Sequence, residues 1–214
     1  MEWNINNSWD FSDTLINVKK DTQDSGVEDI ATQKHKINAE KTYQIIHELE
    51  ELGLPKNGEQ VKIITFKSFN AILFLKHITE KETVEDLKLV IYSFNYDASK
   101  LLDTLINEGK IKKATILMSN LRNKAHREKE QLTRDMLVAN PKIDLFFASS
   151  HAKIMAMRTN KGNNYVIEGS GNLSFNSRIE QYCLSNDSKL FDFTSNWMDE
   201  VKVFLKGKKE LILT

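Results

Sequence analysis

Two pairs of residues in the C-terminal half of the chain could carry chemistry: His151 with Lys153, and Ser170 with Asn172. The members of each pair are two residues apart, so in an extended strand both side chains project to the same face. The imidazole of His151 can act as a nucleophile or transfer a proton, and Lys153 adds a fixed positive charge. Ser170 and Asn172 supply a hydroxyl and an amide donor. Such a set of donors is typical of a pocket for an anion.

The glycines on either side of Ser170 favour the same interpretation. Gly169 and Gly171 would let the backbone approach a ligand closely, so we expect both to contribute to substrate binding. Residues 149–182 contain no carboxylate cluster that would hold a divalent metal ion. The donor set therefore suits a phosphate diester attacked without a metal ion, and we expect no cofactor.

Each of these residues also has a structural interpretation. A lone histidine on a strand is more often structural than catalytic, Lys153 alone would be a surface lysine, and Asn172 alone would be a turn residue. Their combination favours a site. Arg178 could add a phosphate contact, but an exposed salt-bridging arginine is an equally good interpretation. The basic stretch from Arg122 to Arg134 is more simply a solvated helix face than a patch that follows a phosphate backbone.

The site segment lies in a run of alternating strands and helices. The predicted strands are VKIITF, LKLVIYSF, KKATILMSN, IDLFFAS, HAKIMAMR, NYVIEGS and QYCLSN. The predicted helices cover residues 70–79, 97–108, 122–138 and 190–205, and the last has Phe193 and Trp197 facing the core. This order predicts an α/β fold in which a mixed β-sheet is flanked by helices. His151 and Lys153 would then lie on one strand of a hairpin, and Ser170 and Asn172 at the end of the other.

Residues 1–58 have a different pattern and are predicted to form a mainly helical N-terminal extension before a domain of residues 59–214. The polar stretch DTQDSG is typical of a linker, and residues 33–52 carry apolar positions at helical spacing. The 214-residue chain has zero net charge and no apolar run long enough to span a membrane. Its polar N-terminus lacks the features of a signal peptide, so we expect a cytoplasmic protein.

HAK followed by GSGN resembles the HxK and GSxN signature of the phospholipase D superfamily, also called the HKD family. The segment NSRIEQY is similar to that of phage and prophage members, in which a glutamate follows GSxN. The motifs occupy His151 to Glu180, and the order of strands and helices extends the resemblance from Val61 to the C-terminus. The resemblance implies a phospholipase-D-like fold and a single-motif, nuclease-like member of the family.

The resemblance also implies roles for these residues. His151 would attack phosphorus to form a phosphohistidine intermediate. Lys153, Ser170 and Asn172 would bind the non-bridging oxygens, and Glu180 would accept a proton from the histidine ring and orient it. Single-motif members pair two chains, so that a second histidine protonates the leaving group. A homodimer with a shared site is therefore implied.

Two positions depart from the family pattern. The family usually has an aspartate, generally a structural support, where this chain has Arg158. The spacing between Asn172 and Glu180 is also shorter than in the nuclease members. These departures leave the chemistry possible but put full activity and the role of Glu180 in question.

The resulting hypothesis is a metal-independent phosphodiesterase, most simply a nuclease that acts on DNA. Hydrolysis of a phospholipid or a small diester is an alternative with the same chemistry. A second alternative is a module that binds phosphate or nucleic acid with little or no turnover, which Arg158 favours. The zero net charge argues weakly against tight binding of nucleic acid.

Overall fold

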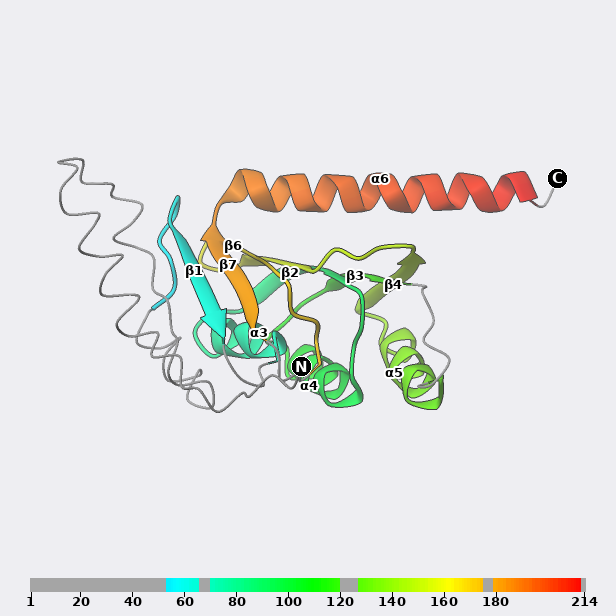
Figure 1. The fold of residues 1–214 in the computed structure, drawn as a ribbon, viewed down its shortest axis with the longest axis horizontal. Coiled ribbons are helices and arrows are strands. Elements are labelled where there is room, and N and C mark those ends of the chain that lie inside the picture. The colour runs from blue at the N-terminus through cyan, green and yellow to red at the C-terminus, as the bar shows by residue number, and fades with distance from the viewer. Residues whose placement is uncertain (1–52, 66–69, 120–126, 175–178, 213–214) are drawn as a thin grey trace, which may run out of the picture. The chain divides into compact units, whose positions relative to one another are not determined.

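The computed structural model describes residues 53–65, 70–119, 127–174 and 179–212, which all belong to one compact unit (Figure 1). The predicted helix at residues 33–52 and the linker before it lie outside the described residues. The last part of the predicted extension packs on the domain. Pro55 is buried, and its carbonyl oxygen accepts a hydrogen bond from Nδ2 of Asn186 at 3.0 Å.

A seven-stranded mixed sheet lies at the centre of this unit, in the order β1-β7-β6-β5-β2-β3-β4. The strands are β1 (Gln60–Thr65), β2 (Val84–Ile91), β3 (Ala114–Ser119), β4 (Ile143–Ala148), β5 (Ile154–Thr159), β6 (Asn164–Gly169) and β7 (Glu180–Asn186). The helices among the described residues are α3 (Ile72–Thr79), α4 (Tyr96–Asn107), α5 (Arg127–Ala139) and α6 (Ser188–Ile212). The predicted fold class, a mixed sheet flanked by helices, is confirmed.

Strand direction follows from how the elements are connected. Strands β2, β3 and β4 are parallel, and the helices α4 and α5 supply the crossover connections that parallel neighbours need. Strand β6 is antiparallel to both of its neighbours, β5 and β7, and β5 is antiparallel to β2. A short hairpin turn joins β5 to β6, with Gly162 at φ 80°, a backbone conformation that glycine adopts without strain.

Helices cover both faces of the sheet, with α6 across one face and α3, α4 and α5 on the other side (Figure 1). Neighbouring residues of β2 show the alternation that produces these two layers. Leu89 is buried in the core beneath α3 and α4, whereas Val90 packs in a second cluster with Met198 of α6. Because successive side chains of a strand point to opposite faces, β2 is apolar on both.

The prediction for the C-terminal helix was wrong in length and in its core face. The helix extends over Ser188–Ile212 rather than residues 190–205. Phe191 and Met198 are buried at 1% and 0% exposure, whereas Phe193, predicted to face the core, is 65% exposed. Two residues along a helix correspond to a rotation of about 200°, so the burial of Phe191 turns Phe193 outward. Trp197 is half-buried against the Val90 cluster, as predicted.

Candidate active site

The β5–β6 hairpin brings the two predicted residue pairs to one edge of the sheet. Strand β5 begins at Ile154, directly after Lys153, and pairs there with Glu168 near the end of β6. The Gly169 amide donates to the carbonyl oxygen of Lys153 at 3.4 Å, which joins the start of one strand to the end of the other. The segment before β5 and the segment after β6 therefore lie side by side, because the two strands are antiparallel.

The strand prediction for His151 and Lys153 was wrong, since both residues precede β5. The physical reason is the loss of a pairing partner. Strand β5 follows β2 as far as the pair Ile154 and Val90, and β2 ends one residue later at Ile91. Beyond that point the chain of β2 turns toward α4, so β2 no longer offers the backbone of His151 a strand to pair with.

His151 and Lys153 nevertheless contact each other directly. Nζ of Lys153 lies 3.4 Å from Nδ1 of His151 and donates to the His151 carbonyl oxygen at 3.0 Å. The His151 side chain is exposed and Lys153 is half-buried. The ring of Tyr92, the first residue after β2, lies against the imidazole with its centroid 4.5 Å away. A basic ring and a cation therefore meet at a position that solvent can reach.

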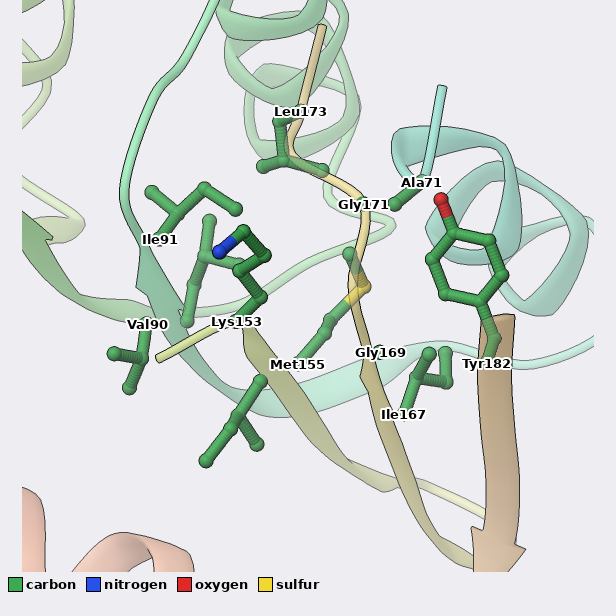
Figure 2. Close-up of a pocket in the computed structure, with 12 residues that line it drawn as sticks. Ala71, Val90, Ile91, Lys153, Met155, Ile167, Gly169, Gly171, Leu173 and Tyr182 are labelled. Atoms are coloured by element: carbon green, nitrogen blue, oxygen red, sulfur yellow. The ribbon is translucent and has the colours of Figure 1, made fainter. Parts of the chain in front are cut away.

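Lys153 also borders a small pocket below this edge of the sheet (Figure 2). The lining is mostly apolar and comprises Ala71, Leu89, Val90, Ile91, Lys153, Ile154, Met155, Ile167, Gly169, Gly171, Leu173 and Tyr182. Lys153 is the one charged residue of this lining. Its aliphatic stem covers apolar surface while the ammonium group reaches the rim. A charge beside apolar surface interacts with an anion more strongly than a charge in bulk water does.

Asn172 is fixed with its amide group oriented. Its Oδ1 accepts a hydrogen bond from the Ser93 amide at 3.3 Å. One residue further on, the carbonyl oxygen of Leu173 accepts from the Asn95 amide at 2.9 Å. Because a backbone N–H must face an acceptor, the Ser93 contact assigns the oxygen of the carboxamide and leaves Nδ2 as a donor for a ligand.

Ser170 and Glu180 form a second pair at the same edge. The Ser170 hydroxyl donates to Oε2 of Glu180, and the Gln181 amide donates to the same hydroxyl oxygen at 3.1 Å. Glu180 is buried at 7% exposure, whereas Ser170 is exposed. The structure thus brings Glu180 to Ser170. The contact between Glu180 and His151 that the resemblance implies stays a prediction.

The two glycines of the segment have a packing role that sequence reasoning missed. A Cβ added to Gly171 would lie 1.9 Å from the Tyr182 hydroxyl oxygen, and one added to Gly169 would lie 2.4 Å from the Gln181 carbonyl oxygen. Tyr182 is buried, and burial together with the nearby charge of Glu180 raises the pKa of its hydroxyl. The glycines therefore let the segment pass over this ring, in addition to any contact with a ligand.

Arg158 lies away from this edge of the sheet. Arg158 is at the far end of β5, where its Nη2 pairs with Oδ1 of Asp192 at 2.6 Å and its Nε donates to Oδ1 of Asn164 at 3.0 Å. Its guanidinium also lies 4.3 Å from the centroid of the Phe191 ring. Arg158 thus ties β5 to β6 and α6. Arg178 lies outside the described residues.

Two further properties concern metals and membranes. Across the described ranges, no three or more His, Cys, Asp or Glu side chains gather in a way that could hold a metal ion. Among the helices of those same ranges, none combines the length and apolar character needed to cross a membrane.

No family model matches the chain, and no curated protein matches it. The chain is, however, similar to solved structures. A phospholipase D family member, Nuc, from Salmonella typhimurium is 19% identical, covers 66% of this chain and 93% of its own, and has a TM-score of 0.48. Polyphosphate kinase from Porphyromonas gingivalis is 12% identical, covers 62% of this chain and 22% of its own, and has a TM-score of 0.44.

Proposed function

We propose that this chain is a metal-independent phosphodiesterase in which His151 is the nucleophile. The observation that carries the proposal is the meeting of His151, Lys153 and residues 169–172 at one edge of the sheet. The imidazole and ammonium groups are 3.4 Å apart there, and the Ser93 amide orients the carboxamide of Asn172 in the segment that follows β6. A nucleophile, a fixed cation and a neutral donor are the groups that an attack on a phosphate diester requires.

The reaction proceeds in two displacements. An unprotonated ring nitrogen of His151 attacks phosphorus, a P–N bond forms, and the P–O bond to the leaving group breaks. Water then attacks phosphorus and the P–N bond breaks, which regenerates the ring. The attacking water gives its proton to the group that protonated the leaving oxygen in the first displacement, so that both groups return to their starting states. Lys153 and Nδ2 of Asn172 bind the non-bridging oxygens, whose negative charge is concentrated in the transition state.

Ser170 contributes less directly in this scheme. A serine hydroxyl has one hydrogen to donate, and here Glu180 accepts it. A phosphate oxygen would have to compete with a carboxylate for that hydrogen. Ser170 and Glu180 together hold the start of β7 against the end of β6, so they position the segment that carries Asn172.

The leaving oxygen needs a proton, and we propose that a second copy of the chain supplies it through its own His151. His77 of this chain is buried in α3 at 1% exposure and does not reach solvent. A two-fold dimer would place two equivalent histidines at one shared site. Strictly monomeric behaviour in light scattering at micromolar concentration would contradict this part of the proposal.

The main test is turnover by the purified full chain in EDTA. A chromogenic phosphodiester reports the chemistry, and single-stranded DNA, plasmid DNA and phospholipid vesicles in parallel report the substrate class, for which we propose DNA. The wild type is expected to hydrolyse the chromogenic diester, and His151→Ala to be inactive. Quenching with a labelled diester should leave acid-labile, base-stable label on the wild-type protein.

Other outcomes distinguish the alternatives. Phosphate or DNA binding without turnover would favour a binding module. Wild-type rates in His151→Ala would exclude the histidine mechanism. A strict requirement for magnesium would indicate a different site.

A further inference from the structure

Tyr92 packs against His151 and lies near the ammonium group of Lys153, yet neither the motif nor the proposed reaction uses it. Its ring centroid is 4.5 Å from that of His151, with an angle of 41° between the ring planes. Nζ of Lys153 lies 5.9 Å from the same Tyr92 centroid. One aromatic ring therefore supports the imidazole and faces the ammonium group. Tyr92 itself is half-buried, so it is held by the protein rather than by solvent.

The backbone around Tyr92 is clamped to the segment that carries Asn172. The next residue, Ser93, donates its amide to Oδ1 of Asn172, and Asn95 donates its amide to the carbonyl oxygen of Leu173 at 2.9 Å. Oδ1 of Asn95 also accepts from the Ala98 amide at 2.8 Å and so caps α4. Because these bonds fix the chain on the C-terminal side of Tyr92 and β2 fixes it on the other, the ring is anchored at its base.

The exposed position of His151 makes such support necessary. Residues 151–153 have no strand ladder of their own, and a solvent-exposed histidine side chain samples several rotamers. A nucleophile that must reach phosphorus in line loses rate when its ring samples other orientations. An aromatic neighbour that packs against the imidazole limits these orientations. Because Lys153 lies against Nδ1, Nε2 is the ring nitrogen left for the attack.

We propose that Tyr92 is a positioning residue that holds the imidazole of His151 in the orientation required for attack. The inference rests on the proposed phosphodiesterase function. The tyrosine ring, not its hydroxyl, performs this role, because the contact with His151 is between the two rings. An aromatic ring also attracts a positive charge within about 6 Å, and the Lys153 ammonium group lies 5.9 Å from the Tyr92 centroid.

The test compares Tyr92→Leu and Tyr92→Phe, with Tyr96→Leu as a matched control. Tyr96 is 42% exposed and lies four residues further on at the start of α4. Removal of an aromatic pair is expected to lower kcat by roughly 10-fold in Tyr92→Leu, with a smaller change in KM, because the ring acts mainly on the orientation of His151. Tyr92→Phe and Tyr96→Leu should retain the wild-type kcat.

A spectroscopic measurement makes the result independent of turnover. The ring-proton resonances of His151, assigned by their loss in His151→Ala, should shift in Tyr92→Leu and stay close to their wild-type positions in Tyr92→Phe. Urea unfolding shows whether each variant is folded, and if Tyr92→Leu does not fold, Tyr92→Met takes its place.

The outcomes separate the inference from the proposed function. If the wild type is active and the folded Tyr92→Leu variant keeps the wild-type kcat, the inference about Tyr92 is overturned and the proposed function stands. Equal loss in Tyr92→Phe also overturns the inference, since the hydroxyl would then be required. A wild type without diesterase activity overturns the proposed function, and the inference with it.

Discussion

The two ends of the β5–β6 hairpin use similar polar residues in opposite ways. At the turn end, Glu82 accepts hydrogen bonds from Oγ1 of Thr159 at 2.6 Å, Nδ2 of Asn163 at 3.0 Å and the Tyr165 hydroxyl at 3.2 Å. Thr159 and Tyr165 are buried there. At the open end, a glutamate and an asparagine occur again, with a serine in place of the threonine, but His151 and Ser170 are exposed.

The difference teaches that residue type alone does not identify a site. The turn end directs its donors inward onto one carboxylate, and Arg158 adds bonds to Asp192 and Asn164 on its outer side. The open end holds Lys153 in the lining of a pocket and keeps the exposed imidazole of His151 against it. Buried polar groups that are fully paired stabilise a fold, whereas exposed ones held in fixed positions are available to a substrate. We therefore expect changes at the turn end to affect stability and changes at the open end to affect catalysis.

The largest expected effect is at the open end. His151→Ala should reduce turnover by on the order of 10⁴ or more, because removal of the nucleophile removes the covalent path. The free energy of unfolding should stay within about 0.5 kcal/mol of wild type, since the side chain is exposed. Turnover of a phosphodiester and urea unfolding measure the two quantities. A large loss of stability with only a modest loss of rate in His151→Ala would show that His151 has a structural role, and it would contradict the expected difference between the two ends.

The next effect is at the turn end. Glu82→Ala removes the acceptor for three donors, and two of the residues that supply them, Thr159 and Tyr165, are buried at 4% and 2% exposure. Unpaired buried polar groups should lower the free energy of unfolding by about 2–4 kcal/mol. The kcat of the folded fraction should not change. Glu82→Gln keeps one acceptor oxygen and should be milder in urea titrations. A loss of kcat in a fully folded Glu82→Ala variant would show that the turn end also affects catalysis at the open end, against the comparison.

A pH titration compares the ends through their tyrosines. Burial and the Glu82 charge raise the pKa of Tyr165 at the turn end, and burial and the Glu180 charge raise the pKa of Tyr182 at the open end. The folded protein thus keeps phenol protons that the unfolded chain loses above a pH of about 10. This stabilisation is complete below that pH and is lost as the pH rises from there toward the folded pKa values.

Above a pH of about 10, each of these tyrosines should lower the free energy of unfolding by up to about 1.4 kcal/mol per pH unit. This slope is that of about one proton bound in the folded state and released in the unfolded state. Urea midpoints measured between pH 8 and 11, roughly the range around the unfolded pKa, give the slope. Tyr165→Phe and Tyr182→Phe should each reduce it. If the pH dependence of the free energy of unfolding is unchanged in either variant, the corresponding tyrosine has the same pKa in the folded and the unfolded protein, and the prediction for it is wrong.

The smallest expected effect concerns the ion pair of Arg158 and Asp192. Their side chains are 45% and 57% exposed, so solvent screening limits the pair to about 0.5 kcal/mol. Arg158→Asp and Asp192→Arg should each lower the urea midpoint slightly through like-charge repulsion, and the double variant should restore it. None should alter kcat. A gain of activity in Arg158→Asp would show that this position acts on catalysis and not on the α6 contact.

Much of the fold could be predicted because its signals are local. Each described strand was predicted within a few residues, since short runs of β-branched and apolar residues between turn residues are typical of buried strands. The start of β5 was misplaced because it depends on where β2 ends, and β2 is far away in the chain. The outward position of Phe193 was missed for a related reason. Helical spacing gives a face but not which face packs, and the burial of Phe191 decided that here.

For the site, the sequence by itself determined which residues are chemically capable and that a hairpin would bring the segment of His151 and Lys153 beside the segment of Ser170 and Asn172. Spacing and residue type carry that information. Only the tertiary structure decided the pairing of Ser170 with Glu180, the orientation of Asn172 by Ser93, and the contact of Tyr92 with His151. Each of these contacts joins residues at least ten positions apart, and such contacts form only when packed strands and helices fix the backbone of both partners.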